Sequence, residues 1–492
     1  MTRSTLRIAF LPLVLFGAVE ACSADDDAPP PLGASPEGGA PDGSSTPAGD
    51  GGDAPDARDA QPAEPTSILS FAEANAIRAL SAGVVEDDVV VAGADNFEDD
   101  AGNRNAVAFR SDLAGRVRWA KRVGGDFNDQ LLTHVVVGAT MHGFGITRTV
   151  FTGAARNTDV LWASVDVATG AVNALRHFGT TANEDALGSV AVADGVVVVG
   201  VSGTDAYVAK VADGAVVWAR TWSTPGTDSF RWVGVAGDEL VAVGFSTLVA
   251  EGGKTEPIVA VFDRNGGHVR SRRITGAAQD VSVFSARVVG GDVVLAGQTR
   301  PAAGAPTVPF AARVPFGDGP LAWARTYTTP ETTGNATFRA TALAGADDAF
   351  DLPETLAVGG SAGGRAFLAR LATSDGQPLA RVLLRAPAEA TIALDREVLW
   401  ERKDRGFGTF FQMTPKGSEV SASGLALTNR LFGLAPACTW ASEPALTLAE
   451  PPGLAAADLA PAVVPATFTV AATGPALVTT DLALTQDVGC AP

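Results

Sequence analysis

The stretch Gly214-Ala215-Val216-Val217-Trp218-Ala219-Arg220 decides the fold of this chain, because it recurs. The pattern G-x-x-x-W-A-[KR] begins again at Gly115, with Trp119, and at Gly319, with Trp323. An Asp lies shortly before each glycine, which is typical of a hairpin turn in which glycine supplies a positive φ. The apolar residues that follow predict a β-strand leaving that turn.

Further turn glycines extend this repeat along the chain. They are spaced by about 50 residues, a period at which repeat architectures form; the full set is Gly115, Gly170, Gly214, Gly266, Gly319, Gly376 and Gly417. Before each of the first six turns lies an apolar strand signal: Ala106–Phe109, Leu161–Val165, Tyr207–Val211, Ile258–Phe262, Phe310–Val314 and Phe367–Leu371.

A second family of apolar runs precedes these strands. The runs are rich in Val and Leu, and each ends in glycine: Val89–Gly93, Val196–Gly200, Leu240–Gly244, Val293–Gly297 and Thr355–Gly359. Runs this short predict strands that are buried on both faces and stopped by the glycine.

Seven units of about 50 residues, each with three or four strands, predict an all-β chain folded as a β-propeller, with seven blades. A sandwich array is the poorer alternative, because its domains are larger than one unit. We expect Trp119, Trp218 and Trp323 to pack between adjacent blades. The repeated basic residues, Lys121, Arg176, Arg220, Arg272 and Arg325, either ring one mouth and bind an anion or, as we favour, pair with repeat residues such as Asp129, Asp185, Asp228 and Asp280 at blade junctions.

On these residues the chain resembles the bacterial seven-bladed propeller-repeat surface proteins. One repeat carries their whole pattern, in Val89–Gly93, Ala106–Phe109, Gly115, Trp119, Gly124-Gly125 and Asp129. The resemblance implies a propeller outside the cytoplasm and says little about activity. A second resemblance links Asp166-Val167-Ala168-Thr169-Gly170 to the tryptophan-docking motif of quinoprotein propellers. The chain has no adjacent cysteine pair, so we do not carry over their cofactor.

Residues 1–22 indicate a targeting segment rather than a part of the fold. Arg3 and Arg7 precede an apolar stretch, Ile8–Val19, that is too short to span a membrane. The segment Val19-Glu20-Ala21-Cys22 resembles a bacterial lipobox, which implies lipidation of Cys22, although Glu20 departs from the pattern. The alternative is an ordinary secretory signal with an incidental cysteine.

Three further segments follow from composition. Residues 23–66, rich in Pro, Gly and Asp, predict a disordered tether, because they hold too little apolar surface to offset the entropy of ordering. Residues 67–433 form the expected propeller, which residues 67–82 close by pairing with the last blade. Residues 434–492 form a C-terminal β segment that either completes the last blade or stands as a small separate unit. With Cys22 lipidated, Cys438 and Cys490 remain as the expected disulfide, with a free thiol as the alternative.

Motifs for catalysis are sparse. The four histidines, His134, His142, His177 and His268, lack zinc-protease spacing. Gly359-Gly360-Ser361-Ala362-Gly363 matches G-x-S-x-G, but a strand rather than a helix follows it, so we place Ser361 in a hairpin loop. An oxygen-rich loop, Asp95, Asn96, Glu98, Asp99, Asp100 and Asn103, resembles no EF-hand, and we favour a solvated turn over a calcium site.

The charge balance limits the partners. The chain has 492 residues and a formal net charge of −19, which argues against nucleic acid and anionic lipid as ligands. We therefore expect a monomeric lipoprotein of the cell envelope, anchored in the outer membrane and facing the surface or the periplasm. It is expected to need no cofactor or metal and to act as a non-catalytic module that binds a protein or glycan. The alternatives are a periplasmic propeller lipoprotein that assists outer-membrane assembly and a propeller enzyme with an unidentified site.

Overall fold

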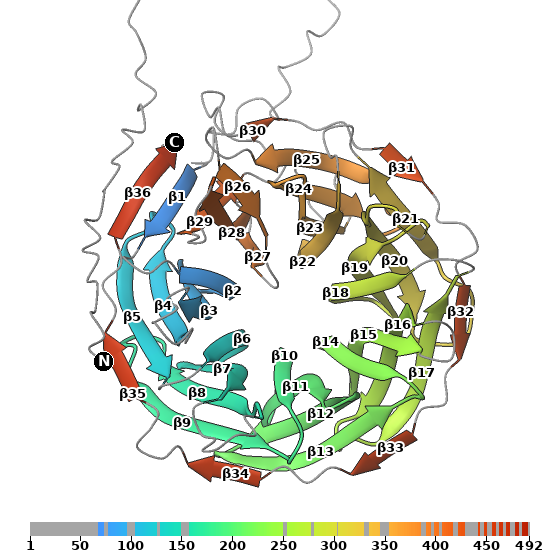
Figure 1. The fold of residues 1–492 in the computed structure, drawn as a ribbon, viewed down its shortest axis with the longest axis horizontal. Helices are drawn as coiled ribbons and strands as arrows, with labels where there is room; N and C mark the ends of the chain where they lie inside the picture. The colour runs from blue at the N-terminus through green and yellow to red at the C-terminus, as the bar shows by residue number, and fades with distance from the viewer. Residues whose placement is uncertain are drawn as a thin grey trace, which may run out of the picture. The chain divides into compact units, whose positions relative to one another are not determined.

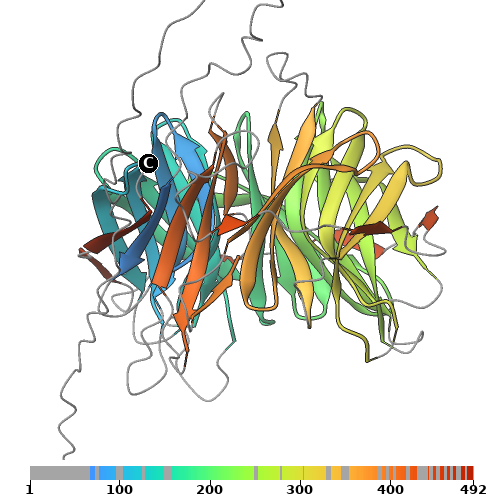
Figure 2. The same ribbon diagram turned by 90° about the horizontal axis from the view of Figure 1, so that it is seen from above.

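A computed structural model gives the fold. It describes residues 67–72, 77–95, 104–124, 128–148, 157–248, 253–276, 280–302, 304–328, 334–344, 354–384, 390–394, 398–402, 406–416 and 422–428, and the C-terminal strands listed below. The predicted signal segment with Cys22, the tether, most of the oxygen-rich loop and Cys438 lie outside the described residues. Within them the strands form seven sheets that stand as blades around one axis, so the chain is a seven-bladed β-propeller (Figures 1 and 2).

Blades 1–6 share one antiparallel plan of four consecutive strands, ordered from the axis outward. Blade 1 is β2 (Ile77–Val85), β3 (Asp88–Asp95), β4 (Ala106–Asp112) and β5 (Val117–Gly124). Blade 2 is β6 (Asp129–Val137), β7 (Thr140–Thr147), β8 (Val160–Asp166) and β9 (Val172–Gly179). Blade 3 is β10 (Glu184–Val192), β11 (Gly195–Ser202), β12 (Asp205–Ala212) and β13 (Ala215–Ser223).

The remaining blades continue this order. Blade 4 is β14 (Thr227–Ala236), β15 (Glu239–Leu248), β16 (Lys254–Asp263) and β17 (His268–Thr275). Blade 5 is β18 (Val281–Val289), β19 (Asp292–Thr299), β20 (Val308–Pro315) and β21 (Trp323–Thr328). Blade 6 is β22 (Ala336–Ala344), β23 (Thr355–Ala362), β24 (Arg365–Ala372) and β25 (Pro378–Leu384).

Blade 7 closes the ring with strands from both ends of the propeller. Its β26 (Ala390–Ala393) and β27 (Leu399–Arg402) both pair with β28 (Gly406–Pro415), which pairs with β29 (Ala422–Thr428). β1 (Ser67–Ala72) then pairs with β29, Ser67 opposite Leu427. Of the segment 67–82 expected to close the ring, only 67–72 does so, because β2 is already the innermost strand of blade 1.

The C-terminal residues run around the outside of the ring (Figure 1). They add one outer strand to each blade in reverse order, from blade 6 down to blade 1 and then to blade 7. These strands are β30 (Ala441–Ser442), β31 (Thr447–Ala449), β32 (Ala455–Asp458), β33 (Ala462–Pro465), β34 (Thr469–Ala472), β35 (Val478–Asp481) and β36 (Thr485–Cys490). We call them the strap. Each pairs with an edge that would otherwise present unpaired backbone groups, so the described strap strands form no sheet of their own.

The core lies in the middle strands of each blade. Every residue of β3 is buried, whereas the outer strand β13 exposes Val217 to 56%. The β-branched runs thus form strands buried on both faces, as predicted. Their glycines do not end them, however: β3 continues through Gly93 to Asp95. This glycine has another role, which is to face a bulge on the innermost strand.

Candidate functional site: the axial cavity

A β-bulge interrupts the innermost strand of blades 1 to 6 at the same position. In blade 1, Ala79 pairs with Gly93 and Ser81 with Ala92, so Leu80 is the extra residue. A Cβ on Gly93 would overlap the carbonyl oxygen of Arg78, so only glycine fits opposite this bulge. The same overlap arises at the glycines opposite the other five bulges, Gly145, Gly200, Gly244, Gly297 and Gly360.

The bulges turn one side chain per blade out of the regular alternation. Around the axis these residues are Leu80, Leu132, Leu187, Arg231, Phe284 and Arg339. Five of them, all but Phe284, line a cavity of about 510 Å³, which we call the axial cavity. The rest of its lining is Arg78, Gln130, Ile146, Asp185, Thr337, Ser361, Ala393, Leu394 and Gln412. The cavity is thus built by a device repeated from blade to blade.

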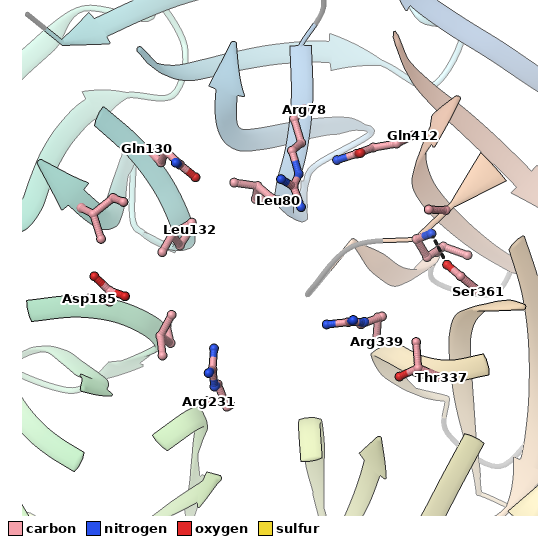
Figure 3. A pocket seen from close by; sticks show the side chains of 14 residues that line it. Arg78, Leu80, Gln130, Leu132, Asp185, Arg231, Thr337, Arg339, Ser361 and Gln412 are labelled. Carbon is pink, nitrogen blue, oxygen red and sulfur yellow. Dashed lines mark hydrogen bonds between the residues drawn. The ribbon is translucent and has the colours of Figure 1, made fainter. Parts of the chain in front are cut away.

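Charge is unevenly distributed around this lining. Among its described residues, three guanidinium groups, of Arg78, Arg231 and Arg339, face one carboxylate, of Asp185. Figure 3 shows the three arginines pointing toward the same space from three blades. In a chain of net charge −19, this cluster is a local excess of positive charge.

Two of the arginines are held by aromatic rings. The Cζ atom of Arg339 lies 4.1 Å from the ring centroid of Phe284, the bulge residue of the neighbouring blade 5. The Cζ atom of Arg231 lies 5.0 Å from the ring centroid of Phe245 on β15. Cation–π contacts of this kind restrict a guanidinium group before any ligand arrives.

The axial cavity does not follow from the predicted strand ends. In blades 1, 3, 4 and 5 the glycine that ends the valine-rich run faces the bulge, whereas in blade 6 the bulge faces Gly360, one residue after the run. A glycine recurring inside a strand pattern also marks a bulge. Four residues of the cavity lie on the bulged strands two positions before the bulge residue: Arg78 in blade 1, Gln130 in blade 2, Asp185 in blade 3 and Thr337 in blade 6.

The predicted repeat tryptophans lie at the outer blade junctions. Trp119 of blade 1 donates from Nε1 to the carbonyl oxygen of Val167 in blade 2, at 2.7 Å, and its ring covers Gly170. Trp323 of blade 5 makes the equivalent bond to Thr373 of blade 6, at 2.9 Å. The ring of Trp218 covers Gly266 of blade 4. The D-x-x-T-G motif is therefore the turn on which Trp119 docks.

The turn glycines adopt the backbone that the motif requires. Gly115 has φ 82°, Gly214 has φ 79° and Gly319 has φ 144°, all in the region that disfavours residues with a side chain. Asp166 shows how such a turn is held, because its Oδ1 accepts hydrogen bonds from both the N–H and the hydroxyl of Thr169. These bonds lower the pKa of Asp166.

Three of the repeated basic residues also lie at junctions, where they donate to backbone carbonyls; one of them, Arg220 of blade 3, donates to the carbonyl of Asn265 in blade 4, at 3.4 Å. Arg176 of blade 2 donates to the carbonyl of Gly214 in blade 3, and Arg272 of blade 4 donates to that of Gly317 in blade 5, at 2.8 Å. The expected aspartate partners have other contacts: Asp228 accepts from Thr224, and Asp280 from Arg300. Tryptophan thus docks at the junctions after blades 1, 3 and 5, and arginine at those after blades 2, 3 and 4.

The junction between blades 2 and 3 lacks the repeat tryptophan. Ala174 stands four residues after Gly170, where Trp119 stands after Gly115. A second cavity, of about 500 Å³, opens there and is lined by Ala174, Trp162, Arg176 and ten neighbours besides Gly214. We call it the junction cavity.

The prediction that Ser361 lies in a hairpin loop is wrong. Ser361 lies inside β23 and pairs with Ala366, because the hairpin turn falls one residue after Ala362. Its Oγ accepts a hydrogen bond from the backbone N–H of Leu394, at 2.8 Å. A strand follows this turn, as expected, so the G-x-S-x-G match is not a nucleophile elbow.

The histidines take part in side-chain hydrogen bonds. His134 of blade 2 is buried and bonds through Nδ1 with Ser81 of blade 1, at 2.8 Å. Burial lowers its pKa to about 4. His177 bonds with Asp159 and His268 with Ser271. No group of three or more His, Cys, Asp or Glu suited to a metal ion occurs within the described ranges.

Other predicted features are only partly visible. Asp95, the first residue of the oxygen-rich loop, bonds with Arg122 at 2.8 Å. Cys490 ends β36, while its expected partner Cys438 is outside the described residues, so the disulfide stays a prediction. In the part of the chain that the structure describes, no helix is long and apolar enough to cross a membrane.

Comparisons with known proteins add little. The chain matches no family model and no curated protein. Among solved structures it is similar to one described as bifunctional GH43-CE from Bacteroides eggerthii, with a TM-score of 0.27 and 8% sequence identity. The match covers 84% of this chain and 64% of that one, so this chain spans less than two thirds of its length. A likeness at this TM-score supports no inference about activity.

Proposed function

We propose that the protein is a cell-envelope lipoprotein whose propeller acts as a non-catalytic binding module for a protein or glycan partner, with the axial cavity as its ligand site. The observation that carries this proposal is the bulge repeated in six blades. Each bulge inserts one unpaired residue into its strand and requires a glycine opposite it, and five of the six inserted residues line one cavity.

The chemistry of the lining favours binding. Guanidinium groups, the amides of Gln130 and Gln412 and the hydroxyl of Thr337 are groups that orient a ligand through hydrogen bonds. Leucines of blades 1 to 3 supply apolar surface beside them. A few polar groups set in a partly apolar pocket of this volume are typical of small-molecule and side-chain recognition.

The lipobox and the tether support the envelope location. A diacylglycerol anchor at Cys22 followed by a long polar segment would hold the propeller away from the membrane. The propeller would then present its axial cavity to partners outside the cytoplasm.

Protease shaving of intact cells that express the protein tests this role, with Cys22→Ser as the matched variant. We expect the propeller to remain with the cells in the wild type and to be shed by the variant. Digestion from outside would direct the search to extracellular partners, and protection until the envelope is opened would favour the assembly factor. Equal retention of both proteins would contradict the anchor.

A further inference from the structure

The structure assigns a ligand class to the axial cavity: we infer that it binds an organic anion, with a carboxylate on Arg231 and Arg339 and an apolar body against the leucine side. This inference rests on the proposed binding function and narrows its ligand.

The lining of the axial cavity carries a local excess of positive charge. The described lining holds three guanidinium groups and one carboxylate, and the excess is therefore positive in a strongly acidic chain. The groups come from blades 1, 4 and 6, which are far apart in the sequence, so the ring itself brings them together. A half-enclosed cavity screens such charges less than bulk water does, which strengthens their hold on an anion.

The shape of the arginine side chains suits a carboxylate. A guanidinium group is planar and presents two parallel N–H donors, which match the two oxygens of a carboxylate. Phe284 and Phe245 make cation–π contacts with Arg339 and Arg231, which restrict the motion of both guanidinium groups. Both groups then meet a ligand without a large loss of side-chain entropy.

The head group of the ligand meets Asp185 as well as the arginines, since Asp185 lies in the same lining. With three guanidinium groups beside it, the described lining still carries an excess of two positive charges, which attracts an anionic head group. The paired N–H donors of Arg231 and Arg339 match the two oxygens of a carboxylate.

The leucines of the lining offer a surface for the apolar body of the ligand. At the bulge position where blades 4 and 6 carry arginine, blades 1, 2 and 3 carry Leu80, Leu132 and Leu187. Figure 3 shows Leu80 and Leu132 on the side of the cavity away from Arg339. Burial of alkyl groups against these leucines adds affinity that a bare anion lacks.

Calorimetric titration with small probes tests the inference on the full chain carrying Cys22→Ser, which needs no detergent. The probes are hexanoate, hexanol, acetate and inorganic phosphate. We expect hexanoate to bind most tightly, at least about tenfold better than acetate or hexanol, since each alternative lacks one of the two features. Its affinity should fall as salt is added.

The ring supplies its own matched variants. Arg231→Leu and Arg339→Leu install the residue that three other blades carry at this position, so the bulge is retained. Each substitution should lower the affinity for hexanoate by about tenfold or more, as expected for a lost charge-assisted hydrogen bond. Arg264→Leu, in the exposed turn after β16, changes the net charge equally and should leave the affinity as it is.

Several results would overturn the inference. They are hexanol binding as well as hexanoate, phosphate binding more tightly than hexanoate, no binding of hexanoate, or equal affinity in the Arg→Leu variants and the wild type. Any of them leaves the envelope role to the shaving experiment, because that readout does not involve the axial cavity.

Discussion

The two cavities of this propeller have nearly the same volume, about 510 Å³ on the axis and about 500 Å³ between blades 2 and 3, yet they arise in opposite ways. The axial cavity is lined by the extra residues of five bulged strands, each opposite a glycine. The junction cavity exists because a side chain is missing: Ala174 stands where the first junction has Trp119. Volume alone therefore does not identify a site, whereas a repeated backbone device with convergent charges does.

The filled junction between blades 1 and 2 gives the largest predicted effect. Trp119→Ala removes a side chain that is only 8% exposed and its hydrogen bond to Val167, leaving a hole like the junction cavity. We expect the free energy of unfolding to fall by about 3–5 kcal/mol. Denaturant titration measures it, with Val217→Ala, on an exposed outer-strand position, as the control. Equal effects of the two substitutions would show that docking does not stabilise the ring.

Low pH should affect the inner edge of the junction between blades 1 and 2 differently from that of the junction between blades 2 and 3. His134 bonds with Ser81 between blades 1 and 2, while Thr133 and Ser189 bond between blades 2 and 3. Since the pKa of His134 is lowered to about 4 in the fold, the unfolded chain takes up the proton first. Stability present at pH 7 is then lost as pH falls from 6.5 to 4, by about 3 kcal/mol. Unfolding followed across this range should show a smaller loss in His134→Gln; an unchanged slope would refute the assignment.

Substitution of a glycine opposite a bulge tests whether the bulges shape the axial cavity. In Gly244→Ala the new Cβ would overlap the carbonyl of Ser229, so the bulge must shift, and we expect a loss of about 2–3 kcal/mol together with weaker hexanoate binding. Gly237→Ala is the matched control, because its φ is also positive, at 59°, but nothing lies within 4 Å of the added Cβ. It should cost about 1 kcal/mol and leave binding intact. A similar outcome for both variants would contradict the role of the bulge.

The empty junction gives the smallest effect. Ala174→Trp supplies the residue found in blades 1, 3 and 5, and we expect it to raise stability by about 1 kcal/mol as the junction cavity fills. Thermal unfolding and hexanoate titration are the readouts. A fall in hexanoate affinity in this variant would show that the ligand occupies the junction cavity.

The sequence predicts the frame better than the site. Turn glycines such as Gly115 and tryptophans such as Trp119 act within a short stretch, so their spacing reveals blade number and junction packing. The bulge beside Gly244 depends on which strand pairs with which, and a single strand does not show its partner. The strap escapes for a related reason, because its strands, two residues in β30 and six in β36, are ordered by the blade edges they cover.

The arginines of the axial cavity were hidden by their distance in sequence. Arg78, Arg231 and Arg339 belong to no local motif, and each is one charged residue in a mostly apolar strand. They become a cluster only when the ring closes and places blades 1, 4 and 6 around one axis.

A crystal structure of the propeller grown with hexanoate would show where the ligand binds. We expect the carboxylate against Arg231 and Arg339, with the alkyl chain toward Leu80 and Leu132. Hexanoate bound in the junction cavity, beside Arg176 and Trp162, would contradict this expectation.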